Sequence, residues 1–292
     1  MERTVRGFLP VNKPPGITSY QVIREIKRYF RGRIGHGGTL DPFAGGLLIV
    51  LLNEATKLAP FILDSEKEYT GTIRLGVKTD TFDITGQTTE QREVPVFSVD
   101  GLQSAAGKFV GSIEQRPPSF AALKHEGKKF YELAREGKDV PVRLRQGVIR
   151  ELEITGYAAP EVGFRAVVGR GTYLRSLAND FGETLGCGGC LAALLRRRIG
   201  RASLDQAVGI PGSLDDMMTK VRPAEELVVH LPRIVTDQVL DLVQGKGVVN
   251  QDGLADGQFV RIVDAAGRFL AIGIAGGKVI KPKRIIFADA VE

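Results

Sequence analysis

The feature that most constrains the fold is a glycine-rich segment, RGRIGHGGTLDPFAGG, at residues 31–46. Its glycines disfavour a regular helix and predict a loop whose backbone approaches another group closely. An uninterrupted apolar run follows from Leu47 to Leu52, which is typical of a buried strand. Ahead of the loop, Ser19 is a suitable N-cap for a helix that we expect to run to about Phe30, with one apolar and one basic face. We therefore expect a loop held between a helix and a buried strand.

The rest of the chain mixes helix and strand patterns. Strand patterns occur at residues 69–75, 147–157 and 164–168, and helical patterns at residues 100–111, after GTYLRS with Gly186 as the stop, and from Cys190 to Arg197. From about Ile234 onward, short strand patterns are separated by turns and predict a small all-β domain. The expected fold class is α+β, with a mixed, mainly antiparallel sheet flanked by helices and a C-terminal all-β domain.

Charge favours a nucleic-acid partner. The 292 residues include 40 Lys and Arg against 34 Asp and Glu, a formal net charge of +6, and four basic clusters are spread along the chain. A solvated surface explains any one cluster, whereas four together favour a polyanion. The clusters lie at residues 24–33, 128–129, 196–201 and 281–284.

Membrane and secretion signals are missing from the sequence. No segment approaches the roughly 20 consecutive apolar residues of a spanning helix, and the first residues, MERTVRGFLPVNKP, lack the apolar core of a signal peptide. We expect a cytoplasmic protein with no membrane association.

The segment ALKHEGKKFYELAREGK mixes basic and aromatic residues. It is compatible with an inserted RNA-gripping segment at about residues 115–143, or with an amphipathic surface helix. The sequence alone leaves both interpretations open.

Metal and redox chemistry have little support. The two cysteines form one CxxC pair, Cys187 and Cys190, and the three histidines are scattered. A structural zinc site needs four ligands, and no second CxxC completes the set. We expect no metal.

Asp41 is the candidate catalytic residue, because the GGTLDP loop can direct its carboxylate into a cleft. Such a carboxylate can act as nucleophile, general base or metal ligand. The glycines are not followed by Gly-Lys-Ser/Thr, so the segment is not a Walker phosphate loop. On local pattern alone, an aspartate before proline is also a common turn former.

Four separated motifs resemble the TruB family of tRNA pseudouridine synthases in order and spacing, over roughly residues 7–201. They are NKPPGITSYQVIREIK, the long stretch from GHGGTLDPFAGG to DTFDITG, RPPSFAALKHEGKKFYELAREG and GTYLRSLANDFGETLG. The C-terminal β segment is similar to the small PUA-type RNA-binding domain of such proteins. The resemblance implies a pseudouridine synthase catalytic domain at residues 1–230 and a PUA-like domain at residues 231–292.

The resemblance also implies an isomerase, a tRNA pseudouridine(55) synthase, which converts uridine 55 of the tRNA T-loop with no cofactor and no metal. A base inside folded RNA must be flipped out before an enzyme can reach it. Asp41 matches the family aspartate that attacks C1′ or C6, or promotes elimination, and Arg175 matches the arginine that pairs with it. The implied partner is the T-stem-loop of tRNA, with the enzyme acting as a monomer that requires no protein partner.

Other matching residues belong to the implied substrate pocket. Tyr69 matches the tyrosine that stacks on the target base and assists proton transfer, and His36 matches the histidine that fills space vacated in the T-loop. Tyr173 and Leu194 match positions that contact the flipped nucleotide. Expected RNA-contact residues are basic side chains near these motifs: Lys13, Lys124, Lys128, Lys129 and Arg196.

The sequence departs from the family at three positions. Cys190 and Leu195 replace the usual histidine and first arginine of a His-x-x-x-Leu-Arg-Arg motif, and Ala121 stands where serine is frequent. The first two replacements affect the register of Leu194 and some phosphate contacts, and the third is expected to be harmless.

Two alternative functions remain. One is a guide-RNA-dependent pseudouridine synthase of the dyskerin type, although the short termini offer few surfaces for further subunits. The other is a tRNA-binding or folding factor with secondary catalysis, which the basic clusters fit equally well.

Overall fold

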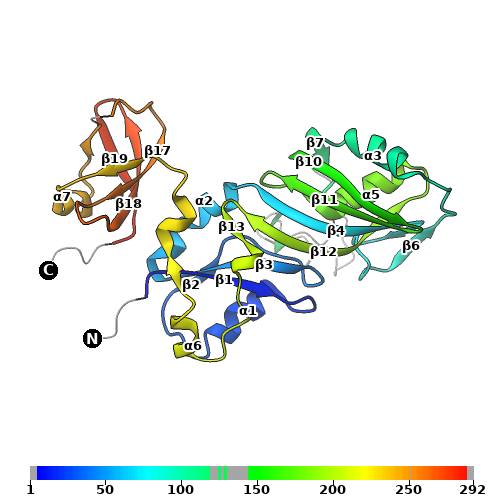
Figure 1. The fold of residues 1–292 in the computed structure, drawn as a ribbon, viewed down its shortest axis with the longest axis horizontal. Helices are drawn as coiled ribbons and strands as arrows, with labels where there is room; N and C mark the ends of the chain where they lie inside the picture. The colour runs from blue at the N-terminus through cyan, green and yellow to red at the C-terminus, as the bar shows by residue number, and fades with distance from the viewer. Residues whose placement is uncertain (1–4, 119–123, 126–127, 130–143, 251, 288–292) are drawn as a thin grey trace.

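A computed structural model describes residues 5–118, 124–125, 128–129, 144–250 and 252–287 (Figure 1). A large sheet forms the body of the molecule. Its strands are β1 (Gly7–Lys13), β2 (Ile34–His36), β3 (Gly45–Leu52), β4 (Lys67–Leu75), β7 (Gly111–Gln115), β10 (Arg145–Ala158), β11 (Glu161–Val168), β12 (Gly189–Ile199), β13 (Ala202–Ser203) and β14 (Arg222–Pro223).

The remaining elements flank this sheet or form smaller ones. The helices are α1 (Ser19–Ile26), α2 (Ala59–Asp64), α3 (Val99–Gly107), α5 (Leu174–Thr184), α6 (Leu214–Met218) and α7 (Val239–Val243), with 3₁₀ turns η1 (Asn53–Leu58), η2 (Leu204–Gln206) and η3 (Ala224–Val228). The other strands are β5 (Val77–Thr79), β6 (Thr88–Gln91), β8 (Lys124–His125), β9 (Lys128–Lys129), β15 (Arg233–Val235), β16 (Val248–Val249), β17 (Phe259–Val263), β18 (Phe269–Gly276) and β19 (Val279–Ile285).

The large sheet has the order β14-β1-β3-β12-β4-β11-β10-β7, with β13 and β2 attached to β12 and β3. Its described strands pair antiparallel except for β12 and β3, which are parallel where Leu195 and Arg196 face Gly45 and Gly46. The predicted α+β class with a mixed, mainly antiparallel sheet is therefore confirmed.

Strand β3 is buried along its whole length, as the apolar run predicted. Successive side chains of a strand point to opposite faces. Leu47, Ile49 and Leu51 accordingly enter one apolar core, and Leu48, Val50 and Leu52 enter another on the opposite face. The loop at residues 37–44 is thus attached to the best-packed strand of the sheet.

Helix α1 begins one residue earlier than predicted, at Ser19, and it ends earlier, at Ile26 instead of about Phe30. Thr18 is the N-cap and forms a capping box with Gln21. The Ser19 hydroxyl is instead engaged with the glycine-rich loop: it accepts from the Leu40 amide at 2.9 Å and donates to the Leu40 carbonyl at 3.2 Å. The cap position is therefore displaced by a tertiary contact.

The predicted helix from Cys190 to Arg197 is wrong, because these residues form strand β12. Leucine, alanine and arginine favour helices, but tertiary context overrides such weak preferences. Here the segment lies between β3 and β4 and pairs with both of them. The departure at Cys190 and Leu195 therefore falls within a central strand.

The C-terminal residues form a separate five-stranded sheet, β15-β17-β18-β19-β16, with its own core, as predicted from the short strand patterns. This domain also packs on the rest of the chain: Phe269, Ile272 and Ile286 join the core that contains Phe8 and Leu51. It lies beside α2 in Figure 1. A boundary at residue 230 remains a proposal.

Only part of the expected insertion at residues 115–143 can be placed. The short strands β8 and β9 pair antiparallel, Lys124 with Lys129 and His125 with Lys128. Ala121 lies outside the described residues, as do the side chains of Lys124, Lys128 and Lys129. None of the described helices is both long and apolar enough to cross a membrane.

The close packing of helix α5 against the backbone at the start of strand β12 can be tested. A Cβ on Gly182 of α5 would lie 2.2 Å from the Gly188 carbonyl carbon, whereas a Cβ on Gly107 of α3 would meet nothing within 4 Å. We predict that Gly182→Ala lowers the free energy of unfolding by about 3 kcal/mol, because backbone atoms must shift. Gly107→Ala, the control, should change it by less than about 1 kcal/mol. Chemical denaturation measures both, and equal stability of the two variants would contradict this packing.

Candidate active site

The loop that carries Asp41 is fixed on both sides of that residue. The Gly16 amide donates to the Pro42 carbonyl at 2.8 Å, and the Ala44 amide donates to the Asp41 carbonyl at 3.1 Å. Leu40 is held by Ser19, as described above. The backbone around the carboxylate is therefore set before any ligand binds.

Lys13 lies beneath this loop and is fully buried. Its ammonium donates to the carbonyls of Ile17 at 2.6 Å, Pro14 at 3.0 Å and Pro42 at 3.3 Å. Burial lowers its pKa to about 8, opposed by the nearby charge of Asp41. The ammonium thus faces three backbone carbonyls of the protein, and the expected contact of Lys13 with RNA remains a prediction.

Arg196 holds the loop from its other side and is 1% exposed. Its guanidinium donates to the carbonyls of Leu47 at 2.8 Å, Gly38 at 3.0 Å and Thr39 at 3.4 Å. The guanidinium is buried behind the loop, and the expected contact of Arg196 with RNA likewise remains a prediction. Both cations support the backbone of the loop that carries Asp41.

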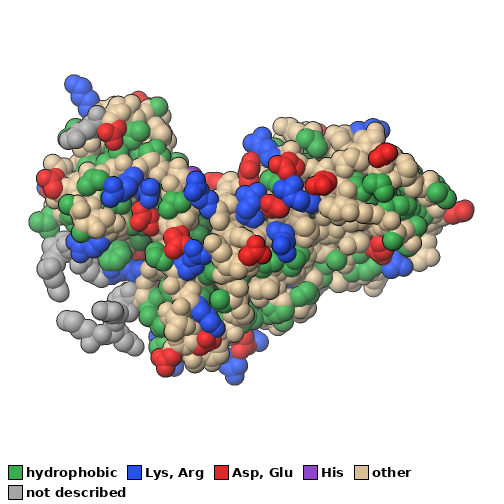
Figure 2. Space-filling view, in the orientation of Figure 1, with side chains coloured by type: hydrophobic (Ala, Val, Ile, Leu, Met, Phe, Trp, Pro, Cys, Tyr) green, Lys and Arg blue, Asp and Glu red, His purple; other side chains and the backbone are tan. Residues whose placement is uncertain are grey.

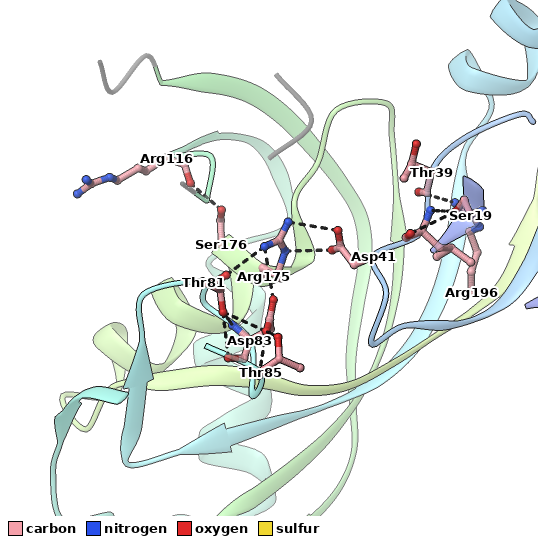
Figure 3. Close-up of polar contacts among 11 residues, drawn as sticks. Ser19, Thr39, Asp41, Thr81, Asp83, Thr85, Arg116, Arg175, Ser176 and Arg196 are labelled. Carbon is pink, nitrogen blue, oxygen red and sulfur yellow. Dashed lines mark hydrogen bonds and ion pairs between the residues drawn. The ribbon is translucent and has the colours of Figure 1, made fainter. Parts of the chain in front are cut away.

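Asp41 forms a two-pronged ion pair with Arg175 (Figure 3). Arg175 Nε lies 3.0 Å from Asp41 Oδ2, and Nη2 donates to Oδ1 at 3.3 Å. Such paired contacts fix both the position and the orientation of a carboxylate. The Arg175 side chain is 7% exposed and that of Asp41 36%, so the acid is open to solvent while its partner is not.

A second carboxylate, Asp83, contacts the same arginine. Arg175 Nη1 lies 3.4 Å from Asp83 Oδ2 and donates to the Thr81 carbonyl at 3.2 Å. Asp83 Oδ1 accepts from the Thr81 hydroxyl at 3.0 Å and from the Thr85 amide and hydroxyl at 3.0 and 2.5 Å (Figure 3). Asp83 is a residue of the site that the sequence patterns did not single out. The sequence does contain a pattern that could have indicated it: Asp83 has a threonine two residues away on each side.

Burial and charge act against each other on Asp41. Desolvation raises its pKa above the ordinary carboxyl value, and the negative charge of Asp83 adds to this, whereas Arg175 and Lys13 lower it. A nearby cation keeps a partly buried carboxylate ionised by compensating for the hydration that it has lost. Arg175 therefore sets both the geometry and the charge of Asp41.

The start of helix α5 delivers Arg175 and is itself anchored. Tyr173 occupies the N-cap position, and its backbone amide and carbonyl both bond to the side-chain amide of Gln115, at 2.9 and 3.0 Å. The Ser176 hydroxyl donates to the Arg116 carbonyl at 2.6 Å. Burial raises the pKa of Tyr173, whose ring is close enough to Asp41 and Arg175 to respond to their charges.

The other predicted pocket residues lie on neighbouring strands. Tyr69 on β4 and Leu194 on β12 are partly buried against the same apolar core as α5. His36 ends β2, and burial together with Arg196 lowers its pKa, so the ring is neutral at pH 7. Its Nδ1 is buried and has no hydrogen-bond partner among the described residues.

Metal ligands do not gather in the described part of the chain, where no three His, Cys, Asp or Glu residues could hold an ion together. Cys187 and Cys190 are free and buried. Burial raises the pKa of both thiols, that of Cys190 to about 11. Both therefore remain protonated and weakly nucleophilic at neutral pH.

Comparison with known proteins identifies two family patterns. "TruB family pseudouridylate synthase (N terminal domain)" matches residues 25–174, and "Pseudouridine synthase II TruB, C-terminal" matches residues 229–286. The chain is 40% identical to tRNA pseudouridine synthase B of Aromatoleum aromaticum, covering 97% of this chain and 94% of that protein. It is 36% identical to the protein of the same name from Thermotoga petrophila, covering 92% and 90%.

Solved structures show the same fold. A chain of the structure described as "Crystal Structure of a Cbf5-Nop10-Gar1 Complex" superposes with a TM-score of 0.74 at 25% identity, covering 96% of this chain and 85% of that one. A chain of an archaeal box H/ACA sRNP Nop10-Cbf5 complex gives 0.72 at 25% identity, covering 98% and 88%.

The support that Arg196 gives to the loop can be tested without substrate. Lysine keeps the charge, but its single nitrogen cannot replace the three separate guanidinium nitrogens that bond to these carbonyls, so we predict that Arg196→Lys lowers the free energy of unfolding by about 2 kcal/mol. Hydrogen exchange at the Leu40 and Ala44 amides should accelerate at least about ten-fold, as expected for local opening of the loop. Arg197→Lys is the control, because that side chain is 44% exposed and lies 3.8 Å from its ion-pair partner, Asp205. Unchanged exchange at Leu40 and Ala44 in Arg196→Lys would contradict the supporting role.

Proposed function

The chain belongs to the TruB family of pseudouridylate synthases, and we propose that it converts the uridine at position 55, in the T-loop of tRNA, to pseudouridine. The observation that carries the proposal is the partly exposed carboxylate of Asp41, held by two contacts to a buried Arg175. That arrangement provides a fixed, ionised acid facing solvent, which a nucleophile or base requires. We further propose that the enzyme acts in the cytoplasm as a monomer, without a cofactor, a guide RNA or a partner protein.

The reaction needs the target nucleotide outside the RNA stack. Flipping costs a few kcal/mol, recovered by stacking and hydrogen bonds in the pocket. Tyr69 and Leu194, partly buried on adjacent central strands, are the side chains that we assign to the two sides of the base. We assign Tyr173 to the sugar side, near Asp41, and His36 to the space that the nucleotide leaves in the T-loop.

The chemistry itself exchanges one bond to the sugar for another. The C1′–N1 bond breaks, the uracil turns and a C1′–C5 bond forms; C5 loses a proton and N1 gains one, so the atoms balance. A carboxylate supports this by attack at C1′, by attack at C6 or by removing a proton in an elimination. In each route Asp41 acts as an anion, which is why Arg175 must offset its desolvation.

The positioning of Asp41 favours an enzyme over a binding or folding factor. RNA binding alone needs surface cations, whereas this chain buries Lys13, Arg175 and Arg196 around one acidic loop. Buried charges are costly unless they are paired and hydrogen-bonded. A protein that only binds tRNA gains nothing from that arrangement.

A direct assay tests the function. Purified protein alone is incubated with unmodified tRNA transcript, and pseudouridine is mapped by chemical derivatisation. We predict product at position 55, no product with a transcript carrying cytidine there, and at least about 10⁴-fold slower formation by Asp41→Ala, since removing a nucleophile costs rates of that order. Asp205→Ala, which removes a carboxylate whose side chain is 80% exposed, is the matched control and should react normally.

The outcomes separate the alternatives. No product from the wild type would overturn the stand-alone enzyme, and product from Asp41→Ala at a normal rate would remove Asp41 from the chemistry. Asp41→Ala should still bind tRNA, with an affinity that falls steeply as salt rises.

A further inference from the structure

A pocket of about 310 Å³ lies between helix α2 and the C-terminal β domain. Both parts of the chain line it, including Phe61 from α2 and Phe259 from β17. The assigned chemistry of Asp41 does not use this pocket. Its side chains nevertheless combine flat rings with cations.

The pocket has an aromatic wall. The rings of Phe61 and Phe259 meet edge to face, with centroids 5.1 Å apart and planes at 90°. Phe259 remains 36% exposed, a large fraction for an apolar ring at a domain junction. His230 also lines the pocket, and burial lowers its pKa, so that its ring is neutral at pH 7. Flat faces of this kind stack on nucleobases of any sequence.

Another part of the lining is cationic. Lys283 and Arg284, at the end of β19, are exposed and form no ion pair with any residue that the structure describes. Figure 2 shows Lys and Arg side chains on both sides of the notch between the C-terminal domain and the rest of the molecule. Two unpaired cations beside an apolar pocket match the charge of a phosphate group.

The acidic residue of the pocket does not cancel this charge. Asp64 accepts a hydrogen bond from Arg170 Nη1 at 2.6 Å, and their ion pair neutralises the carboxylate. Close by, the ammonium of Lys67 donates to the carbonyls of Leu63 and Ser65 at the C-terminal end of α2. The surroundings of the pocket therefore favour an anion.

Helix α2 connects the pocket with the catalytic loop. Its Ile62 packs so closely on Gly37 of the loop that a Cβ on the glycine would lie 2.5 Å from Ile62 Cγ2. Phe61 and Asp64 of the same helix line the pocket. A helix with its side chains is about 10–12 Å across, so an RNA molecule bound at Asp41 is long enough to reach the pocket as well.

We propose that this pocket binds an unpaired nucleotide of the RNA substrate other than the target uridine, with its base against Phe61 and Phe259 and its phosphate on Lys283 and Arg284. The identification of the occupant as RNA rests on the proposed function. The pocket supplies affinity for the substrate and takes no part in the chemistry.

Two matched double variants test the phosphate contacts. Lys283→Ala/Arg284→Ala removes the pocket cations, and Lys278→Ala/Lys281→Ala removes two exposed lysines of the same domain that do not line it. The dissociation constant of unmodified tRNA, measured by filter binding at fixed salt, should rise about ten-fold in the first and less than three-fold in the second. The rate of pseudouridine formation at saturating tRNA should stay at the wild-type value in both.

An uncharged change tests the stacking. Phe259→Leu keeps an apolar side chain but removes the flat ring, so tRNA binding should weaken about five-fold while its salt dependence stays unchanged. Thermal unfolding of each variant establishes that it is folded. If Phe259→Leu is too unstable to assay, the tRNA affinity of Lys283→Ala/Arg284→Ala decides whether the pocket binds RNA.

Three results would overturn the proposal: equal weakening by the two double variants, wild-type affinity in Lys283→Ala/Arg284→Ala, or wild-type affinity in a folded Phe259→Leu. Failure of the proposed function looks different. In that case the wild type forms no pseudouridine, whereas the binding measurements still report whether the pocket holds RNA.

Discussion

The guanidinium of Arg175 joins two carboxylates that come from loops far apart in the sequence. Asp83 is locked by Thr81 and Thr85 and is almost fully buried, and its contact with Arg175 helps to orient that guanidinium. The remaining edge of the guanidinium then binds both oxygens of Asp41. Breaking a buried ion pair costs about 3–5 kcal/mol, because it leaves a charge without compensation. The position of the acid therefore depends on a residue that does not touch it.

The loop that carries Asp41 is supported from behind in the same way. Lys13 and Arg196 are buried cations whose donors all face backbone carbonyls, several of them in residues 38–42. Strand β3 follows the loop and separates two apolar cores, so the support is rigid. Helix α2 packs on this loop and also lines the pocket beside the C-terminal domain. The loop thus links Asp41 to its supporting cations, and helix α2 links the loop to the second proposed RNA contact.

Sequence patterns gave the fold class, strand β3 and the C-terminal β domain, because hydrophobic periodicity reports burial directly. They failed at β12, since Cys190–Arg197 has helix-forming residues whose conformation is decided by pairing with β3 and β4. Asp41 and Arg175 were found through motif resemblance, and the structure brings them into contact. The burial of Lys13 and Arg196 against backbone carbonyls could not be predicted, because sequence shows charge but not burial. Asp83 was missed, because its role exists only through a tertiary contact with Arg175.

A double-mutant cycle on the rate of pseudouridine formation tests most directly whether Arg175 and Asp83 act as one unit on Asp41. Single-turnover rate constants are compared for the wild type, Arg175→Lys, Asp83→Asn and the double variant, all with intact Asp41. If Asp83 acts through Arg175, the double variant is no slower than the slower single variant, since the second change removes support that is already lost. If the two losses multiply in the double variant, the residues act independently and the account is contradicted.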